Sequence, residues 1–347
     1  MDGPSTRAVH AGAEPGAAGA PIAPQPTLAA PYVLPGPPDA SPYGYGREAN
    51  PTWTALEAAL ADLEGGPALV FASGMAAIDA VLRACDGPLV APADGYPGIR
   101  QLAPEARFVP SSTEAFVDAC PGAGLVWVET PSNPMLDVVD IAAVAAAAHA
   151  AGALLAVDNS VITALGQQPL ALGADFSVSA GTKSLAGHSD VLIGTCAAAD
   201  PARLERVLAI RTAAGAIAGG FEAWLVHRSL ATLGLRLERS SATAFAVYEA
   251  LLAAGVPAFH PYATPLGRAQ MAFGGPLVSF DLETEARAQA FLSGAALITE
   301  ATSFGGVHTT AERRGRWGTD AVGPGFVRLS AGVEDTADVV EAVLNAL

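Results

Sequence analysis

The chain is poor in lysine. Of its 18 basic residues 17 are arginine, and Lys183 is the single lysine. A guanidinium can replace an ammonium wherever only positive charge is needed, but it cannot lose its proton and attack a carbonyl carbon. The retained amine therefore indicates chemistry at residue 183. A compositional bias that leaves one surface lysine explains the count equally well, so the neighbouring sequence has to decide.

Cysteine is scarce as well. Cys85, Cys120 and Cys196 lie far apart and include no C-x-x-C pair, which argues against a disulfide framework and a zinc knuckle. The histidines at 10, 149, 227 and 260 have no metal-ligand spacing, so we predict no metal site. The N-terminus has no basic region followed by an apolar run, and we therefore expect no secretory signal and a cytoplasmic location.

Charged residues make up only 15% of the chain, and their balance is strongly acidic, with a net charge of −16. Such a charge repels phosphate backbones and anionic lipids, so we expect neither nucleic acid nor a membrane as a partner. The longest apolar run, residues 141–157, is interrupted by His149 and Gly152. It predicts a helix followed by a buried strand rather than a membrane span.

With 347 residues, 51% of them hydrophobic, the chain has the length of about two domains. Residues 1–50 are rich in Pro, Gly and Ala and predict an extended arm with little regular structure. From 51 to 230, helices alternate with short apolar strands, which predicts an α/β domain with a mostly parallel, doubly wound sheet. One long helical stretch over 221–254 links it to a smaller α+β domain, residues 231–347.

Functional groups are expected at the carboxyl ends of the strands, where doubly wound sheets bind ligands. The strand predicted at 68–72 leads into Ser73-Gly74-Met75 and a helix, whose free N–H groups suit a phosphate. The strands at 154–157 and 175–179 lead to Asp158 and, through Ala180-Gly181-Thr182, to Lys183. A carboxylate at an apolar strand end is costly unless a cation or strong donor meets it.

These groups are what a pyridoxal phosphate site requires. The amine binds the cofactor aldehyde, and the carboxylate keeps the pyridine nitrogen protonated. A P-loop is the competing interpretation of Gly181-Thr182-Lys183-Ser184, but Thr182 separates the glycine from the lysine and no glycine lies five residues earlier. The absence of G-x-G-x-x-G after a first strand argues against a nicotinamide dehydrogenase.

The motifs resemble the Cys/Met-metabolism family of pyridoxal-phosphate enzymes, which contains cystathionine γ-lyase, γ-synthase and β-lyase and methionine γ-lyase. The resemblance runs nearly end to end. It is carried by T-R-A-V-H-A-G at 6–12, Y-G-R-E-A-N-P-T at 45–52, S-G-M-A-A at 73–77, E-T-P-S-N-P at 129–134, V-D-N at 157–159, T-K-S-L-A-G-H-S-D at 182–190 and R-L-S-A-G-V-E at 328–334. It implies fold-type I, a transferase-like architecture, and pyridoxal 5'-phosphate as the cofactor.

The resemblance also implies a role for each matching residue. Lys183 would hold the cofactor and shuttle protons, and Tyr96 would stack on its ring and assist that transfer. The remaining cofactor contacts would come from Asp158 on the pyridine nitrogen, Gly74, Met75 and Thr182 on the phosphate, Asn133 near the ring hydroxyl, and Tyr45 and Arg47 reaching the phosphate of a neighbouring subunit. Arg328, helped by Ser303 and Asn133, would bind the substrate α-carboxylate. From the local sequence alone, an ordinary ion pair is the favoured interpretation of Arg328, and a loop aromatic that of Tyr96.

Two departures from the family pattern concern the phosphate and the substrate. Ala180 stands where relatives commonly have a serine, and Ser179 lies one residue earlier. In the segment 303–308, which would face the distal part of the substrate, His308 stands where relatives often carry Glu. The resemblance implies a homo-oligomer, a dimer of dimers, that eliminates the γ-substituent of L-cystathionine. The alternatives are γ-replacement by a cystathionine γ-synthase, a β-lyase or methionine γ-lyase activity, and a non-catalytic protein that keeps the fold.

Overall fold

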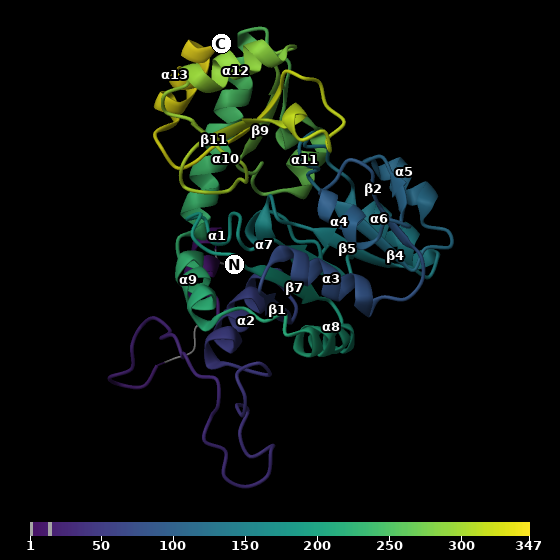
Figure 1. Ribbon diagram of the computed structural model, residues 1–347, viewed down its shortest axis with the longest axis vertical. Coiled ribbons are helices and arrows are strands. Elements are labelled where there is room, and N and C mark those ends of the chain that lie inside the picture. Colours follow the sequence, from purple (N-terminus) through teal and green to yellow (C-terminus); the bar gives the residue numbers. More distant parts are fainter. Residues whose placement is uncertain (1–2, 13–15) are drawn as a thin grey trace.

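The computed structural model describes residues 3–12 and 16–347, and these residues form two sheets (Figure 1). The seven-stranded sheet has the order β1-β7-β6-β5-β4-β2-β3, and the five-stranded sheet has the order β10-β11-β12-β9-β8. The strands of the first sheet are β1 (Ala68–Phe71), β2 (Leu89–Pro92), β3 (Arg107–Val109), β4 (Leu125–Glu129), β5 (Leu154–Asp158), β6 (Phe176–Ser179) and β7 (Gly194–Ala198). All pairs in it are parallel except those of β7, which runs antiparallel to β1 and β6. The expected mostly parallel sheet is confirmed.

Helices cover both faces of this sheet because its strands are apolar on both sides. In β4, Leu125 and Trp127 pack on one face while Val126 and Val128 pack on the other. The helices up to the second sheet are α1 (Pro4–His10), α2 (Pro51–Glu64), α3 (Gly74–Ala84), α4 (Pro97–Leu102), α5 (Thr113–Ala119), α6 (Ile141–Ala150), α7 (Thr163–Gly166), α8 (Pro201–Ala214), α9 (Gly220–Leu230) and α10 (Leu233–Ala253). Alternation of strand and helix thus gives a doubly wound core.

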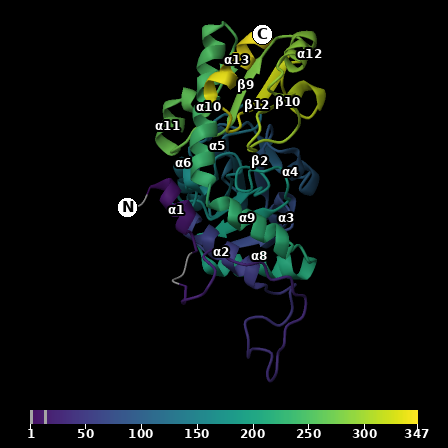
Figure 2. The ribbon, with the colours of Figure 1, turned by 90° about the vertical axis from the view of Figure 1, so that its left-hand side faces the viewer.

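The second sheet packs against α10, α12 (Glu285–Gly294) and α13 (Thr336–Ala346), above the first sheet in Figures 1 and 2. Its strands are β8 (Ala258–Phe259), β9 (Leu277–Asp281), β10 (Thr299–Glu300), β11 (Thr310–Arg313) and β12 (Phe326–Ser330), and α11 (Pro265–Gln270) lies between β8 and β9. The boundaries at residues 50 and 230 stay a prediction. Within the described residues, no helix is both long and apolar enough to cross a membrane.

The structure adds detail to two expectations about helices. The predicted helical stretch over 221–254 is divided into α9 and α10, and at the division the carbonyl of Ser229 accepts hydrogen bonds from the Thr232 N–H and from the Arg236 guanidinium. The arm, predicted to have little regular structure, contains one short helix, α1, whose Ala8 is buried in the same core as α2. The described remainder of the arm, from residue 16 to 50, forms no helix or named strand and extends away from the body (Figure 1).

Candidate active site

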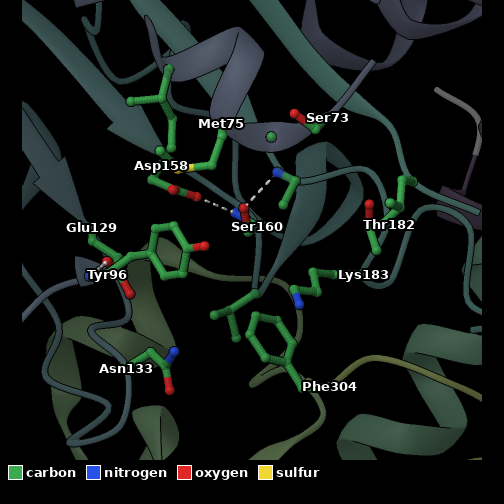
Figure 3. A pocket seen from close by; sticks show the side chains of 15 residues that line it. Ser73, Met75, Tyr96, Glu129, Asn133, Asp158, Ser160, Thr182, Lys183 and Phe304 are labelled. Carbon is green, nitrogen blue, oxygen red and sulfur yellow. Dashed lines mark hydrogen bonds between the residues drawn. The ribbon is translucent and has the colours of Figure 1, made fainter. Parts of the chain in front are cut away.

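A cavity of about 200 Å³ lies where the carboxyl ends of β4, β5 and β6 meet the N-terminus of α3. Figure 3 shows Lys183, Asp158 and Tyr96 around this space. The parallel register places Glu129 of β4 opposite Asp158 of β5, so two acidic side chains end their strands side by side. The strand-end positions predicted from the sequence therefore do come together at one site.

Lys183 lies on the turn after β6, and its side chain reaches into the cavity. The Nζ atom donates a hydrogen bond to Ser303 Oγ at 2.6 Å and lies 5.0 Å from the centre of the Phe304 ring. Burial and the nearby Arg328 guanidinium lower the pKa of Lys183 to about 8, because both disfavour the ammonium form. An appreciable fraction of this amine is therefore neutral, and so nucleophilic, near neutral pH.

Asp158 is the last residue of β5 and lines the cavity. Its Oδ1 accepts a hydrogen bond from the Ser160 N–H at 3.0 Å, and burial raises the pKa of the carboxyl. In the described part of the chain, no basic side chain makes an ion pair with Asp158 within 4.0 Å. A carboxylate in this position fits a ligand that brings its own positively charged N–H group.

The N-terminus of α3 forms the third wall. Ser73 caps the helix by accepting a hydrogen bond from the Ala76 N–H at 3.1 Å, and the N–H groups of Gly74 and Met75 belong to the first turn, which has no intrahelical acceptors. A Cβ atom on Gly74 would lie 2.9 Å from the Cβ of Ala180. The glycine therefore lets this helix end approach the Lys183 turn and offer its N–H groups to an anion.

The hydroxyl groups near the N-terminus of α3 are not arranged as the family resemblance implies, with Thr182 free to bind a phosphate. Thr182 lines the cavity, but its hydroxyl donates to the Ile193 carbonyl at 3.2 Å and accepts from the Ile193 N–H at 3.0 Å. Ser179 Oγ is buried without a hydrogen-bond partner and does not line the cavity. Ser160 Oγ does line it, and it accepts the Ala180 N–H at 2.7 Å. The hydroxyl beside Ala180 thus comes from the end of β5, not from residue 179.

Tyr96 and Glu129 form another part of the wall. The Tyr96 N–H donates to Glu129 Oε2 at 2.7 Å, which fixes the loop that carries the aromatic ring. Burial, with the negative charge of Asp158 beside it, raises the pKa of Glu129 to about 8. Sequence reasoning missed Glu129 and Ser160 as site residues. Glu129 ends β4 and Ser160 lies two residues after β5, so the rule that ligands bind at strand ends could have found them.

The predicted substrate-binding residues lie at the boundary between the two sheets. Arg328 is buried in β12, behind Asn133 and Phe304, which line the cavity. Its Nη1 donates to Asn133 Oδ1 at 2.6 Å and its Nη2 donates to the Ser303 carbonyl at 2.9 Å. Ser303 has a φ of 78°, a left-handed conformation that is strained for a residue with a side chain. The structure therefore brings Arg328, Asn133, Ser303 and Lys183 together.

A second cavity, of about 400 Å³, adjoins the first and shares Thr182, Leu192 and Phe304 with it. His308 and Asp190 lie in its wall.

Tyr45 and Arg47 line neither cavity of their own chain. The Arg47 guanidinium lies 5.6 Å from the centre of the Tyr45 ring and donates to the Thr212 carbonyl at 3.0 Å. These two residues are not brought to the site within one chain.

The amine, the unpaired carboxylate and the helix N-terminus together fit pyridoxal phosphate, whose aldehyde, ring nitrogen and phosphate need these three groups. Related proteins of known name were found over nearly the whole chain. A Streptomyces coelicolor protein provisionally named cystathionine gamma-lyase is 50% identical over 372 residues, covering 99% of this chain and 93% of that protein. A cystathionine gamma-synthase of Mycobacterium tuberculosis is 37% identical over 386 residues, covering 100% and 97%.

Solved structures agree. The apo form of a methionine gamma lyase from Micromonospora echinospora superposes with a TM-score of 0.90 at 38% identity, covering 99% of this chain and 98% of that one. A cystathionine gamma synthase from Xanthomonas oryzae pv. oryzae, in complex with cystathionine, gives a TM-score of 0.91 at 31% identity, covering 100% and 98%. The family model for Cys/Met metabolism PLP-dependent enzymes matches residues 5–347. The chain belongs to this family, and it is a pyridoxal-phosphate-dependent enzyme of sulfur amino acid metabolism.

Proposed function

We propose that the enzyme catalyses γ-elimination on L-cystathionine, which together with one water gives cysteine, 2-oxobutanoate and ammonia. The observation that carries this proposal is the second cavity, because it adjoins the first and has the polar side chains of His308 and Asp190 in its wall. Cystathionine has an amino acid group at each end. With one end beside Lys183, the other end needs a polar space of this kind, which methionine does not need.

Lys183 is the residue we propose for covalent attachment of the cofactor and for proton transfer. No other side chain of this sequence carries a primary amine. Bound pyridoxal phosphate supplies an electron sink that makes the Cα and Cβ protons of an amino acid removable. Once the substrate amino group has displaced it from the cofactor, the neutral amine of Lys183 would accept and return these protons, and its hydrogen bond to Ser303 orients it toward the substrate side. Tyr96, on the opposite wall, would stack on the cofactor ring and assist this transfer.

The remaining contacts follow from charge. Asp158 would hold a protonated pyridine nitrogen, since it offers an unpaired carboxylate, and the N–H groups of Gly74 and Met75 would bind phosphate. Thr182 can join them only if its hydroxyl turns away from Ile193. Arg328 would bind the substrate α-carboxylate beside Asn133, whose Oδ1 already accepts from its guanidinium.

We further propose that two subunits complete each site. The pair of Tyr45 and Arg47 resembles the family segment that reaches a neighbour's phosphate, and both residues lie outside their own chain's cavity. An exposed aromatic ring and an exposed guanidinium on the arm fit such a contact. A dimer would satisfy this requirement, and a dimer of dimers would repeat it.

The first prediction concerns the amine of Lys183. Trace acetylation of the apoprotein should label the Lys183 peptide with a pH midpoint near 8, because burial and Arg328 disfavour the ammonium form. Above that pH the neutral, reactive amine dominates. Arg328→Met should move the midpoint upward, since one positive neighbour is removed. A midpoint near the ordinary value of 10.5, measured by mass spectrometry of the digested protein, would contradict the proposed environment.

The second prediction tests the reaction itself. Purified holoenzyme should release 2-oxobutanoate from cystathionine faster than from methionine, and faster than it forms cystathionine from O-succinylhomoserine plus cysteine. The products, including pyruvate as the sign of β-elimination, are followed by chromatography. Lys183→Ala is the control and should reduce turnover to background, because it removes the amine. A faster synthesis of cystathionine would instead favour the γ-synthase alternative.

The third prediction concerns His308. His308→Ala should lower kcat/KM for cystathionine about fivefold and for O-acetylhomoserine less than twofold, because only the longer substrate loses a hydrogen bond at its distal end. His10→Ala, which removes an exposed histidine of α1, serves as the matched control. Equal losses on both substrates would mean that His308 supports its loop without selecting the substrate.

The fourth prediction concerns the neighbouring subunit. Arg47→Ala should weaken cofactor binding at least tenfold, because a hydrogen bond to a charged group contributes roughly 1.5–3 kcal/mol. Cofactor titration measures the effect, with the exposed Arg287→Ala as the control. Sedimentation should find a dimer or larger species, and a fully active monomer would rule out the shared site.

A further inference from the structure

A carboxylate that lines neither cavity holds Arg328 from within the second sheet. Glu312 lies on β11, directly opposite Arg328 of β12 in the antiparallel register, and is fully buried. Its Oε1 accepts a hydrogen bond from Arg328 Nη2 at 2.6 Å. Of the three acceptors bonded to the Arg328 guanidinium, only Glu312 carries a full negative charge, and charge-assisted hydrogen bonds are the strong ones.

Glu312 is itself held in place from several sides. Oε1 also accepts from Arg314 Nη1 at 2.5 Å, and Oε2 accepts from Trp317 Nε1 at 3.0 Å and from Arg316 Nη2 at 3.1 Å. Burial would raise the pKa of Glu312, but the charges of Arg328 and Arg314 and the Trp317 N–H outweigh it and keep this pKa low. The group is therefore an ionised acceptor whose two oxygens have fixed positions.

We propose that Glu312 is a positioning residue, which fixes the Arg328 guanidinium in the orientation that binds the α-carboxylate of an amino acid substrate. This inference rests on the function proposed above for Arg328. Asn133 and the Ser303 carbonyl hold the guanidinium from the cavity side and the loop, and Glu312 holds it through the neighbouring strand. A substrate carboxylate then meets a guanidinium that no longer has to be oriented, so less freedom is lost on binding.

Glu312→Gln changes both the charge beside Arg328 and the position of its guanidinium, and these two changes have opposite effects on the binding of an anionic ligand. Losing a negative charge near Arg328 would by itself favour an anionic ligand. The Gln side chain, however, directs an NH₂ group at N–H donors whichever way it is turned, because both oxygens of Glu312 accept from such donors. The Arg328 guanidinium must then move. We expect the positional effect to dominate, because the group that is lost is a short, charge-assisted acceptor in a buried site.

The test measures equilibrium binding to the holoenzyme by calorimetry with two ligands. L-Norleucine carries an α-carboxylate and no leaving group, and pentylamine is the same molecule without its carboxylate. Glu312→Gln should weaken norleucine binding about tenfold and pentylamine binding less than twofold. Glu300→Gln is the matched control, because it removes a carboxylate that pairs with Arg316 but does not touch Arg328. This control should change neither affinity.

Each other outcome overturns the proposal. Unchanged or tighter norleucine binding would mean that Glu312 acts only through its charge, and equal weakening of both ligands would mean a general structural role. If Glu312→Gln does not fold, Trp317→Phe serves instead, because its half-exposed side chain donates to Glu312. It should weaken norleucine binding about threefold, and unchanged binding would equally overturn the proposal.

One further variant separates this proposal from the role of Arg328. Arg328→Lys loses the planar fork and should weaken norleucine binding more than Glu312→Gln does. Norleucine binding that Arg328→Lys leaves unchanged would remove Arg328 from carboxylate recognition, and the proposal for Glu312 would fall with it. Sensitivity to Arg328→Lys without sensitivity to Glu312→Gln would overturn the role of Glu312 alone. Neither result depends on whether cystathionine is cleaved.

Discussion

Parallel pairing of β4, β5 and β6 is the constraint on which the site depends. Parallel strands end at the same edge of a sheet, so Glu129, Asp158 and the turn that carries Lys183 meet there although they are far apart in the sequence. Grouping acidic side chains and an amine in one buried place is electrostatically expensive. The raised pKa values of Glu129 and Asp158 and the lowered pKa of Lys183 are the direct result of that burial.

The second sheet contributes a positively charged side chain next to these acidic groups. Arg328 comes from antiparallel strand β12 and reaches the same boundary, where it lowers the pKa of Lys183. Glu312 on the adjacent strand keeps that guanidinium in place without entering the cavity. The first sheet thus supplies the groups that suit the cofactor, and the second supplies those that suit an amino acid. The amine of Lys183 lies between the two sets: the negative charge of Asp158 favours its ammonium form, and Ser303 accepts its hydrogen bond.

The sequence was sufficient to identify the site residues that lie at the end of an apolar strand or just after it. Lys183, Asp158 and Gly74 each follow a recognisable apolar strand, so the general rule for doubly wound sheets was enough to group them. Glu312 could not be found in this way, because its importance comes from an antiparallel register with a residue sixteen positions away. The break between α9 and α10 depends on a side chain, Arg236, that bonds to the preceding helix end. Both pairings depend on specific side chains that meet between elements, and hydrophobic periodicity does not encode them.

The relatives explain why the chemistry is easier to assign than the substrate. A cystathionine gamma-lyase, a cystathionine gamma-synthase and a cystathionine beta-lyase align with this chain at 35%, 37% and 33% identity. These reactions share an α-amino acid group and a cofactor, so the groups at the strand ends can serve all of them. Selection must therefore act on the part of the substrate beyond Cγ or Cβ. In this chain that part would meet the segment from Ser303 to His308, where a strained Ser303 backbone joins the site of the reactive amine to the second cavity.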